Sequence, residues 1–469
     1  MRSTRYTSLR KINPASAIPG VLAAVLLLPN PVQGQDSHWW TNQYGNRARL
    51  LGGAVIGSSR DLSAVYYNPG GLAVVDHPEA LLTGYVFELD NIRYSDVLFR
   101  GDDLSSTRFD VVAGLIAGEL PFKFLGSNRI AYSYLTRHNL EYRFTRGATL
   151  TGDTLAGFEG IDDIGASLNF ESRLREYWGG LTWSRPFAEK YGVGMSMFVA
   201  NRSQRLRYNS SLTAAGEGIG VASTTSLQQY NYYDWRLLAK IGISTSFPRW
   251  NVGLTLTTPS LHLFGSGDLG YQSVGVGSGL ETVTIDFQEG LSSGYQSSWA
   301  IGLGGEYAGE DWKGHVALEW FDRIDSTVID GNPFTSQTDS TLVVDYDVRN
   351  VMKSLVNVAL GLERTFSDGL SGYATAYTDF TGKEDGDGSI TTTTPWHLWT
   401  VGTGAIFNVG RSEFTLGLTY KFGGRDDLTT FGFVPFDGED PGFLSESARG
   451  RFWRLTLILG FKLEFAPDI

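Results

Sequence analysis

Residues 451–465 alternate strictly between apolar and polar side chains. Odd positions are apolar and even positions are mostly polar: Trp453, Leu455, Leu457, Leu459, Phe461, Leu463 and Phe465 against Arg454, Thr456, Gly460, Lys462 and Glu464. A period of two predicts a β-strand with one apolar face. The same pattern occurs at 235–247 and at 414–422. Aromatic residues at the ends of such runs and aliphatic residues between them are typical of a lipid-facing band between two aromatic girdles.

Fourteen runs of this kind predict an all-β protein; they span 79–94, 106–118, 128–147, 167–185, 190–213, 229–247, 250–273, 294–308, 312–330, 353–367, 369–382, 395–408, 412–425 and 449–465. The connections alternate in length. Short links at 248–249, 309–311, 368 and 410–411 alternate with long polar links at 148–166, 274–293, 331–352 and 426–448. This alternation predicts a fourteen-stranded antiparallel transmembrane β-barrel over residues 79–465, with tight periplasmic turns and long outer loops.

Residues 1–34 have the three parts of a secretory signal peptide. A basic start is followed by 13 apolar residues at 17–29 and then by Val32-Gln33-Gly34, so cleavage is expected before Gln35. The apolar run is too short to span a bilayer as a helix. We therefore expect the protein in the outer membrane of a Gram-negative-type bacterium, surrounded by outer-membrane lipid and most simply as a monomer.

Composition excludes several classes of function. The chain has no cysteine, which rules out disulfides, thiol catalysis and cysteine-based zinc sites. A net charge of −12 argues against a nucleic-acid partner. The Gly-x-Gly-x-x-Gly pattern at 265–270 is followed by residues unsuited to a helix, so we interpret it as a glycine-rich strand end rather than a nucleotide site. No pattern predicts a cofactor, a metal site or an enzyme.

Residues 35–78 precede the first predicted strand. A fourteen-stranded barrel is wider than one that side chains can fill, so this segment is predicted to plug the lumen. Its residues Asn68, Pro69, Gly70, Gly71 and Leu72 predict a rigid turn, because proline fixes φ and glycine permits positive φ. We refer to these five residues as the plug turn.

The segment Ser63-Ala64-Val65-Tyr66-Tyr67-Asn68-Pro69-Gly70-Gly71-Leu72 resembles the N-terminal hatch of FadL-type outer-membrane transporters. The family usually has Asn-Pro-Ala-Gly-Leu, from which Gly70 differs by one methyl group. The resemblance implies passive transport of long-chain fatty acids or other hydrophobic compounds, with a hatch that substrate binding shifts. It also implies a lateral exit at a kink in the third strand. Run 128–147 has no glycine before Gly147, so a kink there requires a bulge near Asn139.

Two sets of residues are candidates for ligand contact. Five bases are expected to face the lumen: Arg236, Lys240, Lys421, Arg454 and Lys462. We favour mutual pairing with acids such as Glu306, Glu363 and Glu464, since buried charges need partners; alternatively, one unpaired base binds the carboxylate of a ligand. Four rings, Phe431, Phe433, Phe436 and Phe443, either line the route by which a hydrophobic ligand enters or cap the barrel.

Two other functions fit the same strands. The first is a related barrel that serves as a non-conducting partner subunit in secretion or surface assembly. The second is a secreted, tryptophan-rich, carbohydrate-active β enzyme, which would be soluble without detergent. The loops distinguish the first from a transporter, because a partner subunit exposes a flat protein-sized patch whereas a transporter's loops converge on a pocket.

Overall fold

The computed structural model describes residues 37–74, 80–82, 85–98, 101–120, 126–151, 161–187, 190–217, 220–277, 280–383, 394–409, 412–428 and 448–463. The described chain begins with two short α-helices, α2 (Asn46–Leu50) and α3 (Ala64–Tyr67), and a 3₁₀ helix, η1 (Pro69–Val74). None of its helices is long and apolar enough to cross a bilayer. Residues 37–74 are called the N-terminal segment below.

The other regular elements of the described chain are all β-strands. The bounds are β1 (Ala80–Leu82), β2 (Tyr85–Ser95), β3 (Asp103–Ala113), β4 (Leu115–Glu119), β5 (Arg129–Thr151), β6 (Asp163–Phe187), β7 (Tyr191–Gly216), β8 (Gly220–Ser246), β9 (Trp250–Thr257), β10 (Leu261–Gly277), β11 (Leu280–Ser292), β12 (Ala300–Ala308), β13 (Trp312–Phe321), β14 (Ile324–Ile329), β15 (Phe334–Thr335), β16 (Val343–Val344), β17 (Val348–Met352), β18 (Leu355–Ser367), β19 (Leu370–Asp379), β20 (Leu398–Val409), β21 (Ser412–Leu428) and β22 (Ala448–Leu463).

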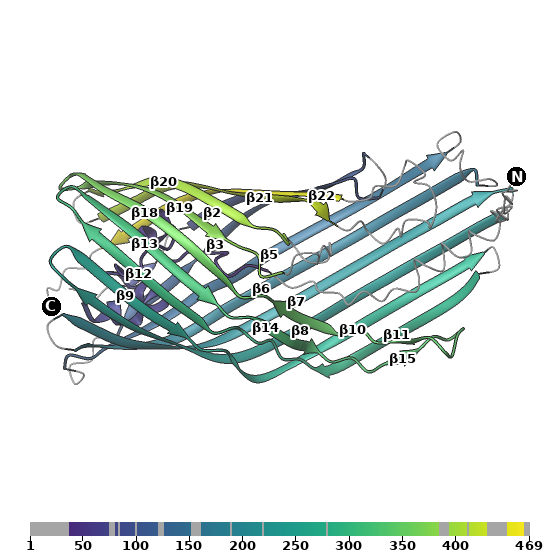
Figure 1. The fold of residues 1–469 in the computed structure, drawn as a ribbon, viewed down its shortest axis with the longest axis horizontal. Helices are drawn as coiled ribbons and strands as arrows, with labels where there is room; N and C mark the ends of the chain where they lie inside the picture. Colours follow the sequence, from purple (N-terminus) through teal and green to yellow (C-terminus); the bar gives the residue numbers. More distant parts are fainter. Residues whose placement is uncertain are drawn as a thin grey trace, which may run out of the picture.

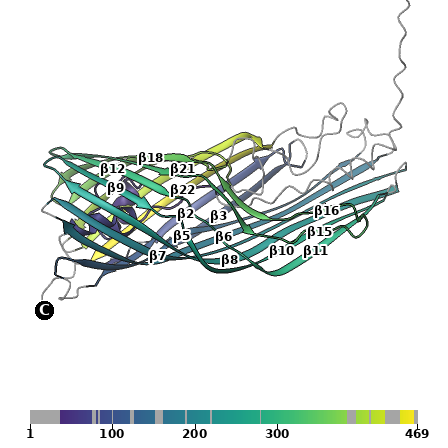
Figure 2. The same ribbon diagram turned by 60° about the horizontal axis from the view of Figure 1, so that its bottom comes forward.

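Every strand pairing is antiparallel, as predicted. From β4 the pairings run through β5, β6, β7 and β8, which continues to both β9 and β10. From β9 they pass to β12, β13, β18, β19, β20, β21 and β22. Strand β22 then pairs with β2, so the last strand of the chain lies beside one of the first. The strands β5 to β8, β10 and β11 extend well past the others at one end of the molecule (Figures 1 and 2).

The two faces of the sheet differ as the alternation predicts. On β22, Leu457 and Phe461 are 38% and 42% exposed, whereas Arg454 is 4% exposed. On β8, Ile241 and Ile243 are exposed while Arg236 and Lys240 are buried. The sheet therefore turns its apolar side chains outward and buries charged side chains within, the reverse of a water-soluble protein.

The prediction of a long outer loop at 274–293 is wrong. Strands β10 and β11 stay paired up to Gly277 and Leu280, so most of this stretch is strand. Residues 282–287 read Thr-Val-Thr-Ile-Asp-Phe, which is the same period-two alternation as in the predicted strands. Thr284 is buried while Ile285 and Phe287 are exposed, so the alternation has the same direction as in the other strands. The stretch 331–352 likewise contains β15, β16 and β17. The glycine-rich pattern at 265–270 lies within β10, as strand.

The expected irregularity in the third long strand is present. The register between β5 and β6 shifts between Thr136 and His138, which leaves Arg137 as the extra residue of a bulge, two positions before the expected site. Strand β4 pairs with β5 up to Leu135, and the Thr136 amide donates to the Gly114 carbonyl at 3.2 Å. Beyond this point, no backbone pairing joins β3 to β5 among the described residues. We call this interval the β3–β5 seam.

Candidate functional site

The plug turn lies deep inside the molecule, against the wall formed by β7, β8 and β9. Asn68 is fully buried, and its Nδ2 donates to the carbonyl of Ile56 at 2.8 Å and to that of Ile243 on β8 at 3.0 Å. Its Oδ1 accepts from the Gly70 amide at 3.1 Å. One side chain thus forms hydrogen bonds with two carbonyls and one amide in the buried interior. The asparagine ties the turn both to itself and to the strand behind it.

Gly70 is needed for close approach, not for positive φ as predicted. Neither Gly70 nor Gly71 has a positive φ. A Cβ on Gly70 would lie 2.6 Å from the carbonyl oxygen of Gly192. Four wall glycines, Gly192, Gly194, Gly242 and Gly253, face the turn, and a Cβ on each would come closer than 3.0 Å to it. Because these glycines have no side chains, the backbone of the wall packs directly against the backbone of the plug turn. We call the four wall glycines the glycine seat.

Replacing one wall glycine is expected to loosen the N-terminal segment without unfolding the sheet. In Gly242→Ala the new methyl would overlap Asn68 Oδ1, and overpacking of this kind costs about 1–3 kcal/mol. Because the chain has no cysteine, a Cys replacing buried Ser63 is a unique reporter. Its thiol labelling should be roughly tenfold faster in Gly242→Ala. Gly179→Ala is the matched control, since a Cβ there meets nothing within 4 Å; equal rates in both would disprove the seat.

A buried ion cluster anchors α2 to strands β12, β13 and β18, of which β12 is the next strand after β9 in the sheet. Arg47 Nη2 lies 2.7 Å from Glu363 on β18 and 3.3 Å from Glu306 on β12. Burial opposes the charge on Arg47, but the two carboxylates outweigh it and raise the pKa of the guanidinium. His315 on β13 lies 3.6 Å from both carboxylates, and its Nδ1 is 3.1 Å from the Ser58 hydroxyl. The cluster thus holds two parts of the N-terminal segment.

A second anchor holds the start of the segment. The Trp40 amide donates to Asp379 of β19 at 2.9 Å, and its indole Nε1 donates to Glu319 of β13 at 2.7 Å. Both carboxylates also pair with a base of the wall: Lys421 lies 3.1 Å from Asp379, and Lys240 lies 3.4 Å from Glu319. Asp379 and Glu319 would therefore each keep an ion-pair partner in the wall even without Trp40.

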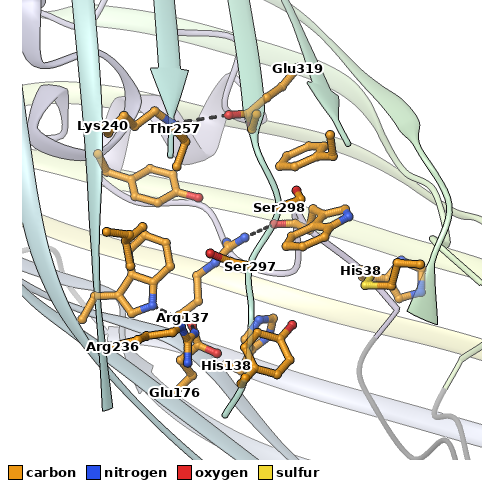
Figure 3. Close-up of a pocket in the computed structure, with 18 residues that line it drawn as sticks. His38, Arg137, His138, Glu176, Arg236, Lys240, Thr257, Ser297, Ser298 and Glu319 are labelled. Carbon is orange, nitrogen blue, oxygen red and sulfur yellow. Dashed lines mark hydrogen bonds and ion pairs between the residues drawn. The ribbon is translucent and has the colours of Figure 1, made fainter. Parts of the chain in front are cut away.

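A small cavity lies between the N-terminal segment and the wall (Figure 3). Its volume is about 50 Å³, room for a few water molecules. The apolar part of its lining comes from Trp39, Tyr66, Trp178, Leu238, Ala300, Phe321 and Met352. Trp39 stacks on Phe321 with ring centroids 5.0 Å apart. The polar part includes Arg137, His138, Glu176, Arg236, Lys240 and Glu319.

Arg137 differs from the other buried bases of this cavity. It is the bulged residue of β5 and is 5% exposed. Its guanidinium donates to the Trp39 carbonyl and lies over the rings of Tyr66 and Trp178, at 5.8 and 5.6 Å from their centroids. Its Nη1 has no hydrogen-bond partner, and no carboxylate among the described residues forms an ion pair with it. Figure 3 shows the side chain reaching toward the middle of the cavity.

Side chains cross the β3–β5 seam where the backbone pairing ends. Arg108 of β3 donates to the Asn139 carbonyl of β5 at 2.6 Å, and the Asn139 amide donates to Asp110 of β3 at 2.6 Å. Arg108 also pairs with Asp90 at 2.9 Å. Side-chain contacts of this kind separate at lower cost than a continuous ladder, because each can be replaced by water.

The predicted lumen bases pair with acids of the wall. Arg236 contacts Glu176 and Asp234, and Arg454 contacts Asp90 at 2.9 Å and Glu88 at 3.2 Å. Lys240 and Lys421 pair with Glu319 and Asp379, as described above. The backbone of Lys462 pairs with Glu413, and its side chain lies outside the described part of the chain, as does Glu464. Phe431, Phe433, Phe436 and Phe443 also lie outside the described residues.

Arg137 is the residue that the sequence reading missed. In the printed sequence it stands in a polar stretch, Thr136-Arg137-His138-Asn139, where the alternation of run 128–147 breaks down. A break in parity inside a strand indicates a bulge. The break in alternation can be detected in the sequence. The absence of an ion pair between Arg137 and a carboxylate cannot, because its neighbours Trp39, Tyr66 and Trp178 come from other parts of the chain.

The fold is shared with solved channels for hydrophobic compounds. The toluene transporter TodX of Pseudomonas putida aligns with a TM-score of 0.57 and 12% identity, over 91% of this chain and 99% of its own. A FadL homologue of Pseudomonas aeruginosa gives 0.55 and 12%, over 91% and 99%. The toluene transporter TbuX of Ralstonia pickettii gives 0.51 and 11%, over 90% and 99%. No protein-family model and no curated protein matches the sequence. The predicted all-β, FadL-like fold is confirmed.

Proposed function

We propose that the chain forms a closed, fourteen-stranded barrel in a bacterial outer membrane and lets hydrophobic small molecules pass without an energy source. Counting β1 with β2, β3 with β4, β9 with β10, β11 with β12, β13 with β14 and β17 with β18, and leaving out the β15–β16 hairpin, gives fourteen strands. The pairing of β22 with β2 supports closure. Closure would leave no strand edge in lipid. The exposed apolar face of the strands suits a bilayer.

The observation that carries this proposal is the way the N-terminal segment occupies the interior. Tyr44, Leu50, Leu51, Leu62 and Val65 are at most 1% exposed. They pack in one cluster with residues of strands from around the sheet, among them Leu115, Ala131, Trp178, Phe198, Leu238, Tyr373 and Ile458. The segment then acts as a hatch. Where Trp39 and Tyr66 of the segment face the wall, the cavity measures about 50 Å³, so a long-chain ligand can pass there only after the segment shifts.

The cavity supports an amphiphilic ligand with one anionic end. Trp39, Trp178 and Phe321 offer apolar surface, and Arg137 offers a buried guanidinium that forms no ion pair with a described carboxylate. A guanidinium binds a carboxylate through two parallel hydrogen bonds, the strongest neutralisation open to it. A long-chain fatty acid has both parts. Arg137 also lies next to the β3–β5 seam, so a ligand released there would leave sideways between strands rather than along the barrel axis.

Uptake by whole cells tests the proposal. The protein is produced in a Gram-negative strain that lacks its own long-chain fatty-acid transporter. Uptake of radiolabelled oleate should rise by at least about tenfold over the empty strain, while uptake of a disaccharide should stay at the background level, because the interior offers a sugar no open path. A heat-modifiable gel shift of the outer-membrane fraction verifies assembly. A correctly assembled protein that raises no hydrophobic uptake would favour the non-conducting partner subunit instead.

A further inference from the structure

The outward face of β5, β6 and β7 carries a group of arginines, which point away from the interior and cannot contact a ligand there. The cross-strand rows are Asn139–Arg175–Ser203, Glu141–Arg173–Arg205 and Arg143–Glu171–Arg207. Five arginines therefore stand beside two glutamates on three adjacent strands. Arg143, Arg175, Arg205 and Arg207 are exposed, and Arg173 is partly buried. We call these five arginines the basic patch.

The acids of the patch are already engaged. Glu141 accepts two hydrogen bonds from Arg173, both at 2.9 Å. Glu171 lies 3.5 Å from Arg143. Arg175, Arg205 and Arg207 form no ion pair with any described residue. Arg205 also stands directly opposite Arg173, and like charges in facing positions destabilise a sheet. Arg207, in contrast, faces Glu171. Among the described residues, three arginines of the patch are therefore left without an ion-pair partner.

Aromatic rings fix the level of the patch relative to the membrane. On β6, Tyr177 is the next outward residue after Arg175, and its ring stacks on that of Tyr134 at 6.0 Å. On β8 and β10, Trp235 stacks on Phe264 at 5.9 Å. From Tyr177 to Phe187 the strand covers ten residues, roughly 34 Å along its axis, or about 26 Å at the usual barrel tilt. That matches the height of an apolar band, so Tyr177 marks its outer edge.

Arg175 and Arg173 are two and four residues beyond Tyr177. With the same rise and tilt they lie roughly 5 and 10 Å above the ring, the depth at which lipid headgroups begin. A soluble protein partner has no reason to bind at the level of the lipid headgroups. The phosphate group of a lipid lies at this level when its acyl chains pack along the apolar band below. Arginine is the side chain best suited to bind a phosphate group.

We propose that the basic patch binds the phosphate groups of a phosphorylated glycolipid in the outer leaflet of the membrane. The inference rests on the membrane placement under the proposed function but not on transport. The acyl chains would pack on the exposed apolar side chains of the same strands, including Leu181, Met197 and Val199. Arg175, Arg205 and Arg207 would each donate to phosphate oxygens, and the patch would order one lipid against β5, β6 and β7.

The test measures lipid A binding to the detergent-solubilised protein by native mass spectrometry. The variant Arg175→Gln/Arg205→Gln/Arg207→Gln should bind diphosphorylated lipid A roughly 100-fold more weakly than the parent, on the basis of about fivefold per arginine. The matched control is Arg185→Gln/Arg249→Gln/Arg364→Gln, which removes three exposed arginines outside the patch, two on strands β6 and β18 and one in the link between β8 and β9, and should bind as the parent does. Fully dephosphorylated lipid A should bind weakly to all three proteins.

Three results would overturn the proposal. The first is equal binding of phosphorylated and dephosphorylated lipid A by the parent. The second is equal loss in the control variant, which would indicate attraction by net charge alone. The third is displacement of the lipid by inorganic phosphate at millimolar concentration, which would indicate a free-anion site. The heat-modifiable gel shift verifies folding of each variant. Oleate uptake by the same variants separates this proposal from the transport function, because a patch variant should lose lipid binding and keep uptake.

Discussion

A protein without residues 37–74 is expected to fold into the membrane and to conduct ions at least about ten times better than the intact protein. The strand ladders do not depend on the N-terminal segment, and the buried charges that Trp40 contacts keep wall partners in Lys421 and Lys240. Without the segment, the lumen of the fourteen-stranded barrel that we propose would be too wide for side chains to fill. Planar-bilayer recording measures the conductance, and the heat-modifiable gel shift verifies folding.

The complementary experiment fastens the segment in place. A Cβ on Gly361 of β18 would lie 3.3 Å from the Cβ of Leu51, close to the separation found in disulfides. The chain has no cysteine, so Leu51→Cys/Gly361→Cys contains a single possible bridge. Oleate uptake should be abolished after oxidation and restored after reduction. Uptake that is indifferent to oxidation, together with unchanged conductance of the deletion protein, would show that the segment is not a hatch.

The variant Arg137→Met is expected to lower oleate uptake by at least about tenfold, because an Arg–carboxylate pair shielded from water is worth several kcal/mol when one partner is removed. Methionine keeps much of the length of the side chain. It also leaves no described carboxylate without an ion-pair partner, since Glu176 keeps Arg202 and Arg236. We therefore expect the variant to fold, with a thermal stability close to that of the parent.

The ligand itself provides the control. Methyl oleate has the same chain and no charge, so its uptake should differ less than about twofold between Arg137→Met and the parent. Arg137→Lys should recover part of the oleate uptake, because lysine keeps the charge but loses the planar pair of donors. If both ligands lose uptake equally in Arg137→Met, Arg137 shapes the cavity rather than binding a carboxylate.

The strand content and the inward direction of the charged residues could be predicted from the sequence because both depend on the alternation of side chains at odd and even positions along a strand. A strand that alternates places Arg454 and Leu455 on opposite faces whatever surrounds it. The same rule predicts a strand at residues 282–287, where Thr284 is buried while Ile285 and Phe287 are exposed. A loop is predicted there only if the polar residues are given more weight than their alternation with apolar ones.

The candidate site could not be predicted in the same way. Contacts such as Arg47 with Glu363, or Trp40 with Asp379, join residues more than 300 positions apart. The role of Gly70 depends on Gly192 and Gly242 behind it, and no feature of the Asn-Pro-Gly-Gly turn itself reveals that wall. Sequence reasoning gave positive φ as the reason for the glycine, which the structure contradicts; φ is a local property and the available space is not.

The bulge at Arg137 changes which residues of β5 face outward, from even-numbered to odd-numbered positions. Before it, even-numbered residues such as Tyr132 and Tyr134 face outward; after it, Arg143 is exposed while Tyr142 and Phe144 are buried. Because Arg137 is the extra residue, a chain without it would keep Thr136 opposite Tyr177 and His138 opposite Glu176, with every other side chain on its present face. A residue deleted at a regularly paired position of β5 would instead reverse the side chains on one side of the deletion, so that rings would stand in water and an arginine would point into the core. Related sequences should therefore tolerate the loss of the bulged residue better than an indel elsewhere in this strand, which is equivalent to a frameshift in three dimensions.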